Sequence, residues 1–345
     1  MKKGTLIYFC VALFALLNCK SSKDSNSPAT FDFAKGADVG WLTQMEASGI
    51  KFYNSSGSQQ DCMQILKDKG INSIRLRAWV NPPDGWNNTT DVMVKAKRAQ
   101  NLGMKIMIDF HYSDSWADPG KQFKPKAWAT LSFDSMKTSL YNYTKGVMDT
   151  LKLNGIIPDW VQIGNETNDG MLWEDGRASK SMANFSALIK AGYDAVKVVS
   201  SSSKVIVHLS NGYDNNLFRW MFDGLKSNGV NYDIIGMSLY PSYAPSGISG
   251  WSGVNTQCLA NMNDMISRYG KPVMIVEVGM PVNDPNTAKL FLTDIINKTK
   301  SISGGNGLGV FYWEPECYNN WQGYGLGAFD DTGKPTVALD AFADN

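Results

Sequence analysis

Histidine is scarce in this chain, and neither sign of charge dominates. Only two histidines, His111 and His208, occur among 345 residues, which argues against a metal centre built from several imidazoles. Lysine and arginine together number 33 against 32 aspartates and glutamates, giving a formal net charge of +1. Because non-specific binding of nucleic acid or another polyanion needs an excess of positive charge, the composition gives no indication of such a partner.

Cysteine is also sparse, with five residues in the whole chain. Cys10 lies in an N-terminal apolar run and Cys19 lies two positions after that run, which leaves Cys62, Cys258 and Cys317 for the folded part. An odd number of cysteines without CxxC spacing makes neither a disulfide framework nor a zinc site. One bridge between two of the three stays possible, but the pattern favours buried free thiols.

Only one apolar run is long, and it is too short to span a bilayer. Two lysines precede Thr5–Leu17, the pattern of a signal peptide. The run ends in Leu16–Cys19, which resembles the lipobox of bacterial lipoproteins, although an asparagine replaces the usual small residue before the cysteine. The resemblance implies cleavage after residues 1–18, lipidation of Cys19, and an exported protein anchored in the outer membrane, at the cell surface or the periplasmic face. An ordinary cleaved signal is the alternative. The Ser-rich stretch 19–31 has the composition of a flexible tether.

Apolar side chains are plentiful, and their pattern predicts a barrel. Hydrophobic residues make up 43% of the chain, enough for a large core. Amphipathic helical patterns such as Asp61–Lys69 and Asn184–Val199 alternate with β-rich runs. The runs are Gly36–Val39, Ser73–Val80, Lys105–His111, Trp160–Glu166, Lys204–Ser210, Ile234–Leu239, Val273–Glu277 and Gly309–Trp313. Eight strands alternating with helices predict a single α/β domain, a (β/α)8 TIM barrel, over residues 32–345. A doubly wound sheet is the rival, but no glycine-rich phosphate motif follows an early strand.

The predicted strands end in polar or aromatic residues, and the carboxyl ends of strands are where such a barrel carries its chemistry. These residues are Asp38, Arg75, Arg77, Trp79, Asp109, His111, Asn165, Glu166, His208, Tyr240, Glu277 and Trp313. Any single one could meet solvent or cap the next helix. Eight coordinated endings instead indicate a site at the barrel mouth.

Glu166 and Glu277 are the strand-end residues that say most about the chemistry of the site. They close the fourth and seventh strands, and a carboxyl there is costly unless it is paired or used. Two carboxyls facing each other across the mouth are what a glycosidase needs for an acid/base and a nucleophile. Spacing alone leaves open a structural role in which both acids pair with Arg75 or Arg77.

Several blocks in the chain carry a specific resemblance. They are Asn72–Pro82, Asp109–Pro119, Gln162–Glu166 with Leu172-Trp173, His208–Gly212, Gly236–Pro241 and Val310–Pro315. In this order they resemble glycoside hydrolase family 53, the endo-β-1,4-galactanases, over nearly all of residues 33–345. The resemblance implies a retaining, endo-acting enzyme that cuts β-1,4-galactosidic linkages in the (arabino)galactan side chains of pectin.

The resemblance also implies roles around the reacting sugar. Glu166 would be the proton donor (acid/base) and Glu277 the nucleophile. Asn165 would hydrogen-bond the 2-hydroxyl of the sugar, Tyr240 would hold the nucleophile, and Arg75 would keep it ionised.

The remaining expected substrate-binding residues surround this pair. His111 and His208 would contact the sugar or the acid/base, and Trp313 would form the apolar floor of the subsite. Trp79, Trp86 and Trp116 would be outer stacking platforms, with core or loop packing as the alternative for each. Asp38 is counted with the substrate-binding residues.

The sequence departs from the family in two loops. Bacterial relatives often carry an acidic calcium-binding loop after the nucleophile, whereas here one acid, Asp284, follows Glu277 before a helical pattern. Since calcium needs several closely spaced oxygen ligands, no metal or other cofactor is expected. The loop Glu316–Trp321 after the eighth strand is short, which puts binding subsites built there in doubt.

Two further functions stay open. One is a clan relative that acts on another β-1,4-polysaccharide such as mannan or cellulose. The other is a glycan-binding surface lipoprotein without catalysis, against which the presence of both glutamates argues. The expected partners are β-1,4-galactan and galacto-oligosaccharides. We expect a monomer that binds no nucleic acid and meets the membrane only through its lipid.

Overall fold

The computed structural model describes residues 1, 2, 4 and 32–344. The predicted signal peptide, the lipidation site Cys19 and the Ser-rich tether lie outside the described residues and stay predictions. Within the described part, no helix is both long and apolar enough to cross a bilayer. Residues 31–345 form one unit, and its Cys62, Cys258 and Cys317 are buried free thiols, as expected.

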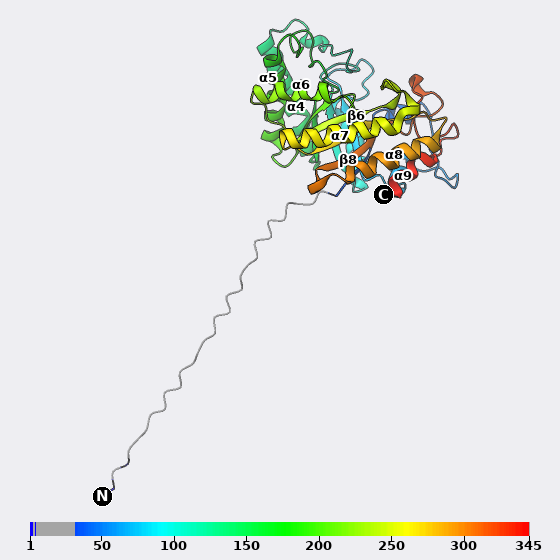
Figure 1. Ribbon diagram of the computed structural model, residues 1–345, viewed down its shortest axis with the longest axis horizontal. Helices are drawn as coiled ribbons and strands as arrows, with labels where there is room; N and C mark the ends of the chain where they lie inside the picture. Colours follow the sequence, from blue (N-terminus) through cyan, green and yellow to red (C-terminus); the bar gives the residue numbers. More distant parts are fainter. Residues whose placement is uncertain (3, 5–31, 345) are drawn as a thin grey trace. The chain divides into compact units, whose positions relative to one another are not determined.

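The unit is a closed barrel of parallel strands that are hydrogen-bonded in chain order, with β1 returning to β8. Strands β6 and β8 are labelled in Figure 1, with helices α7 and α8 beside them. The strands are β1 Ala34–Asp38, β2 Ser73–Ala78, β3 Lys105–Phe110, β4 Trp160–Ile163, β5 Lys204–Leu209, β6 Ile234–Leu239, β7 Val273–Val278 and β8 Gly307–Tyr312. The prediction of a (β/α)8 barrel is confirmed. In the register, Asp38 of β1 lies beside Arg75 of β2, so two expected site residues meet at the carboxyl ends.

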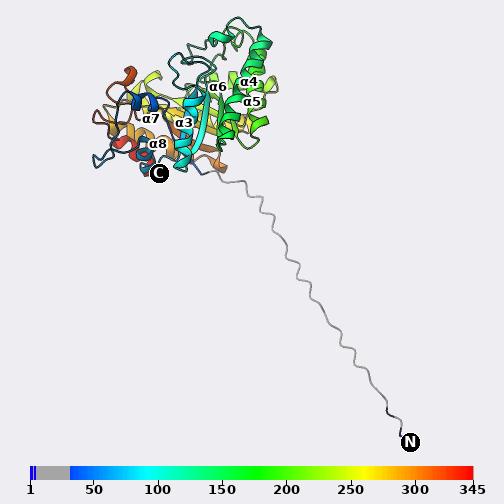
Figure 2. The ribbon, with the colours of Figure 1, turned by 180° about the vertical axis from the view of Figure 1, so that it is seen from behind.

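Helices cover the outside of the barrel, with α3 on the side that Figure 2 turns toward the viewer. They are α1 Leu42–Ala47, α2 Cys62–Asp68, α3 Thr89–Asn101, α4 Phe133–Leu153, α5 Met182–Val199, α6 Asn215–Ser227, α7 Trp251–Tyr269, α8 Pro285–Lys300 and α9 Asp340–Ala343. Many begin at a side chain that accepts a hydrogen bond from a free backbone N–H of the first turn. These capping residues are Asp61, Asn88, Ser132, Ser181, Asp214 and Asp284.

The interior of the barrel, beneath the carboxyl ends of the strands, is packed with apolar side chains. One buried cluster comprises Ala34, Met107, Trp160, Ile206, Ile234, Met274, Val276 and Phe311. Trp160 and Phe311 meet edge to face, with centroids 6.2 Å apart. A Cβ on Gly36 would lie 2.0 Å from the Phe311 ring, so only glycine fits beneath it. Because this end is filled, chemistry is confined to the carboxyl ends of the strands.

The fourth strand ends earlier than expected, at Ile163 rather than Glu166. Gly164 and Glu166 have φ values of 82° and 44°, in the left-handed region that interrupts a ladder. The chain therefore turns out of the sheet, and Glu166 stands on a tight bend at the barrel mouth.

Candidate active site

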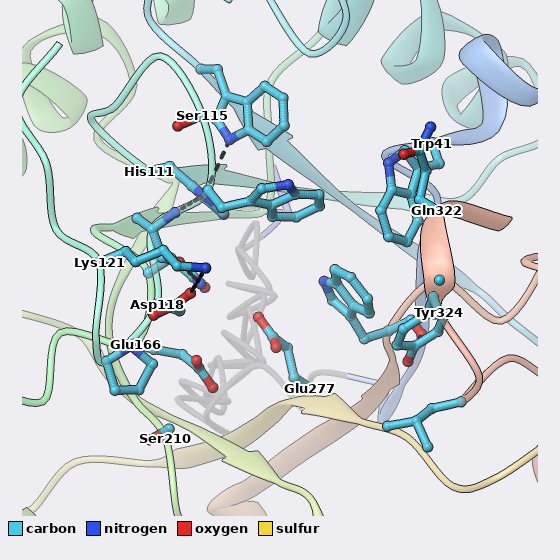
Figure 3. A pocket seen from close by; sticks show the side chains of 18 of the residues that line it. Trp41, His111, Ser115, Asp118, Lys121, Glu166, Ser210, Glu277, Gln322 and Tyr324 are labelled. Carbon is cyan, nitrogen blue, oxygen red and sulfur yellow. Dashed lines mark hydrogen bonds and ion pairs between the residues drawn. The ribbon is translucent and has the colours of Figure 1, made fainter. Parts of the chain in front are cut away.

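A cavity of about 840 Å³ opens at the barrel mouth (Figure 3). Glu166 and Glu277 line it from opposite sides, and Figure 3 shows their carboxyl groups turned toward one another. Of the other expected site residues, Trp79, His111, Trp116, Asn165, Tyr240 and Trp313 also line this cavity. The structure thus gathers residues from six different strand ends around one pair of carboxyls.

Glu277 is held in place by two groups. It belongs to β7 and is buried, and its Oε1 lies 2.8 Å from Nη1 of Arg75. The Tyr240 hydroxyl donates to Oε2 at 3.1 Å. Burial raises the pKa of Glu277, and the adjacent guanidinium of Arg75 opposes that rise. A fixed carboxylate with a cation on one oxygen is suited to nucleophilic attack.

Arg75 is the centre of a buried polar network beneath the cavity. Its guanidinium forms ion pairs with Asp38 at 2.6 Å and Asp109 at 2.9 Å as well as with Glu277. It also donates to Asn165 Oδ1 at 2.9 Å, while Asn165 Nδ2 donates to the Ala117 carbonyl at 2.8 Å. These contacts fix the amide of Asn165 where it faces the cavity.

Glu166 has the environment of a proton donor. Burial, and then repulsion from Glu277, raises its pKa to about 8, while a hydrogen bond with Ser238 acts in the opposite direction. At neutral pH the carboxyl is therefore largely protonated, whereas its partner across the cavity lies against a cation. Two facing carboxyls in such different environments can serve as an acid and a base.

His208 supports Glu166 from below. It is fully buried, and its Nδ1 accepts from the Glu166 backbone N–H at 3.3 Å and from Gln162 Nε2 at 3.0 Å. Nε2 therefore carries the ring proton and lies 2.7 Å from Ser238 Oγ. Burial, followed by the charge of Arg75, lowers the pKa of His208 well below its usual range, so the ring is neutral.

Hydrogen bonds on both ring nitrogens also hold His111 in one orientation. Its Nδ1 accepts from Trp79 Nε1 and from the Ala117 backbone N–H, both at 3.2 Å. Nε2 therefore carries the proton and donates to Asp109 Oδ2 at 2.9 Å. The ring is held in one tautomer at the cavity edge, where Figure 3 shows it.

One side of the cavity is an aromatic wall, which we define as Trp41, Trp79, Trp116, Trp313 and Tyr324. Neighbouring rings meet at steep angles, with centroid distances of 5.3 Å for Trp41–Trp116 and 4.7 Å for Trp313–Tyr324. Flat aromatic faces at an angle to one another suit a ligand that bends.

Four residues expected to bind substrate do not line the cavity: Asp38, Arg75, His208 and Trp86. The first three are buried beneath the cavity. Arg75 contacts Glu277 and Asn165, His208 contacts Glu166, and Asp38 contacts Arg75, so they can act on a ligand only through those residues. Trp86 is half-buried in the loop before α3 and does not line the cavity, although Pro83 and Asp84 of the same loop do.

The sequence reasoning also missed residues. Trp41 follows β1 by three positions, a strand-end signal that could have been recognised. Tyr324 and Gln322 line the cavity and follow directly after the short loop Glu316–Trp321, none of whose residues lines it. Ser238 lies within the block Gly236–Pro241, but it was not singled out there because a serine inside an apolar strand has no distinctive pattern.

Two places in the described structure, Asp284 and a cluster around Glu314, bear on the expectation that no metal is bound. Asp284, the acid after Glu277, accepts from Thr287 N as the cap of α8, so its carboxylate is already used. Among the described residues, Glu314, Glu316 and Cys317 lie close enough to ligate one ion. Glu314 is already paired with Arg77 and accepts two backbone N–H groups.

The sequence profile of glycosyl hydrolase family 53 matches residues 34–342. This chain belongs to that family. It is 36% identical over 308 residues to a probable arabinogalactan endo-β-1,4-galactanase A of Neosartorya fischeri, covering 83% of this chain and 85% of the relative. It is 35% identical over 335 residues to an uncharacterized protein of Niallia circulans, covering 88% and 89%.

Solved structures agree with this membership. A fungal β-1,4-galactanase superimposes with a TM-score of 0.84 at 31% identity, covering 90% of this chain and 99% of that one. The family 53 catalytic domain of Ignisphaera aggregans gives a TM-score of 0.81 at 29% identity, covering 90% and 95%.

Proposed function

We propose that this family 53 glycosidase is a retaining endo-β-1,4-galactanase acting on the galactan side chains of pectin. The observation that carries the chemistry is the contrast between the two facing carboxyls. Glu277 is paired with Arg75 and Tyr240, while the pKa of Glu166 is raised to about 8.

In this proposal the two acids act in two steps. Glu166 first gives its proton to the glycosidic oxygen while Glu277 attacks the anomeric carbon and forms a covalent glycosyl-enzyme. Glu166, now ionised, then removes a proton from a water molecule that displaces the sugar from Glu277. Retention requires the carboxyls to lie about 5–5.5 Å apart, and this separation stays a prediction. Asn165 would hydrogen-bond the sugar beside the acid/base.

The preference for galactose rests on the relatives and on the cavity wall. The Neosartorya fischeri relative is named as a probable arabinogalactan endo-β-1,4-galactanase, and one of Thermothelomyces thermophilus as an arabinogalactan endo-β-1,4-galactanase. An axial 4-hydroxyl bends a galactan chain at every linkage, and the angled rings of the aromatic wall suit such a path better than a flat cellulose chain.

The test compares initial hydrolysis rates on unsubstituted galactan, mannan, carboxymethyl-cellulose and xylan at equal concentration. We expect galactan to be cleaved fastest, with a spread of oligosaccharides from the first time points. The Glu277→Gln variant should lose turnover while still binding galacto-oligosaccharides. Faster cleavage of another polymer, or release of galactose alone from chain ends, would overturn the substrate assignment.

We further propose that the enzyme is exported and anchored by lipid at Cys19. The support is the run Thr5–Leu17 and the lipobox-like residues that follow it. Growth with labelled palmitate should label the wild-type protein in the membrane fraction and not the Cys19→Ala variant. Equal labelling of both, or none of either, would contradict the anchor.

A further inference from the structure

We propose that Arg77 is a positioning residue that sets the orientation of Trp41, Trp79 and Trp116 in the aromatic wall, and thereby the affinity for a galactan chain. The inference rests on the proposed function for the identity of the ligand. Its structural basis is a buried cation beneath three indole rings that line the cavity.

Arg77 contacts all three rings. The guanidinium carbon lies 4.5 Å from the ring centroid of Trp116, 5.0 Å from that of Trp41 and 5.4 Å from that of Trp79. The residue is 4% exposed, so these contacts are shielded from water. Cation–π attraction is strongest for tryptophan and increases when the cation is desolvated. One side chain therefore contributes to the placement of three lining rings.

The hydrogen-bonding pattern of Arg77 supports this role. Its Nη1 pairs with Glu314, whereas its buried Nε and Nη2 have no hydrogen-bond acceptor within the described structure. Arg75, two positions earlier on the same strand, is instead surrounded by three carboxylates and two amide oxygens. The remaining charge of Arg77 is thus stabilised by aromatic faces, which constrains where those faces lie.

The partner acid ties the same ion pair to the backbone of the wall. Glu314 accepts from the backbone N–H of Gly40 at 2.9 Å and of Trp41 at 3.0 Å. A Cβ on Gly40 would lie 2.1 Å from Arg77 Nη1, so the backbone packs directly against the guanidinium. Trp41 is consequently held at its main chain by Glu314 and at its ring by Arg77.

Neither member of the pair lines the cavity, so a contribution to binding has to pass through the rings. Only Arg provides a planar cation that can stack against indole, and a lysine ammonium does not reproduce that geometry. We therefore expect loss of Arg77 to weaken binding of long oligosaccharides more than it slows the chemical step at Glu166 and Glu277.

The main variant is the double substitution Arg77→Met with Glu314→Gln. It removes both buried charges together, which avoids stranding one of them. The amide oxygen of glutamine can still accept from one of the two N–H groups, of Gly40 and Trp41, that Glu314 binds with its two oxygens. The matched control is Lys69→Met with Asp340→Asn, a partly buried ion pair at 2.8 Å that does not line the cavity.

Binding is measured by titration calorimetry of β-1,4-galactotetraose into each variant on the Glu277→Gln background. We expect the Arg77/Glu314 variant to bind about tenfold more weakly, as for loss of an anchoring aromatic contact. Its near-ultraviolet circular dichroism should change, since this signal reports the surroundings of the indoles. With Glu277 intact, its KM should rise by a larger factor than its kcat falls. The control should match the parent in all three.

Arg77→Lys keeps the charge opposite Glu314 and serves if the double variant does not fold. We expect it to fold and to show the same weaker binding and changed dichroism. A folded variant with parental affinity and KM would overturn the proposal, as would a fall in kcat with KM unchanged. Failure of the parent itself to bind galactotetraose would instead count against the proposed function.

Discussion

His208 Nε2 lies 2.7 Å from the Ser238 hydroxyl oxygen and donates a hydrogen bond to it. That hydroxyl is in turn hydrogen-bonded to Glu166, and His208 Nδ1 accepts from the Glu166 backbone N–H. Glu166, the proposed acid/base, is therefore held at both its side chain and its main chain by one buried histidine on β5 and its serine neighbour on β6.

Removal of the Ser238 hydroxyl should change the pH profile. The hydrogen bond lowers the pKa of Glu166, so Ser238→Ala should raise it. Because the acid/base must be protonated to act, the alkaline limb of kcat/KM should move to higher pH. Ser203→Ala, which removes another buried hydroxyl bonded to the Pro158 carbonyl, should leave the profile in place. An alkaline limb that stays fixed or moves downward in Ser238→Ala would contradict this role.

Loss of Arg75 should affect both stability and the acidic limb. Arg75→Met strands buried acids and should lower the free energy of unfolding by about 3–5 kcal/mol, measured by urea denaturation. Arg75 lowers the pKa of Glu277, so without it that pKa rises and the ionised nucleophile persists only at higher pH. The acidic limb of activity should therefore move upward.

The comparison variant for Arg75→Met is Arg98→Met, which removes more exposed ion pairs with Glu46 and Asp61. It should cost about 1 kcal/mol or less and leave the pH profile unchanged. The Arg75 account fails if Arg75→Met is as stable as Arg98→Met or keeps the parental acidic limb.

The two tryptophans Trp116 and Trp86 should behave differently. Trp116 lines the cavity and Trp86 does not. Trp116→Ala should therefore raise the KM for galactan about tenfold or more, whereas Trp86→Ala should stay within about twofold. Steady-state kinetics on soluble galactan would decide this, and equal effects of the two changes would remove the basis for the aromatic wall.

Metal removal should not alter catalysis, because two carboxyls suffice for the proposed steps. Prolonged treatment with a chelator should leave initial rates within error of the untreated enzyme. Complete loss of activity that one specific cation restores would reveal a catalytic ion. A lower melting temperature alone would indicate only a structural ion.

The sequence was sufficient to predict the barrel and the placement of Glu166 and Glu277 at its mouth, for a physical reason. Strands, helix caps and strand-end carboxyls such as Glu166 and Glu277 depend on residues that are close together in the chain, so the sequence alone reveals them. The direction in which a side chain points is not local, which is why Trp86 was expected in the cavity and Tyr324 was not. Arg75 and Arg77 look alike in sequence, yet one is surrounded by acids and the other by indoles.

The central claim is that Glu166 and Glu277 hydrolyse β-1,4-galactan by double displacement, and proton NMR of the first products tests it most directly. The spectrum of a galactan digest is recorded within the first minutes, before the anomers of the new reducing ends equilibrate. We predict that the β-anomer appears first and the α-anomer grows in later by mutarotation. Initial appearance of the α-anomer, or no new reducing ends from galactan, would contradict the account.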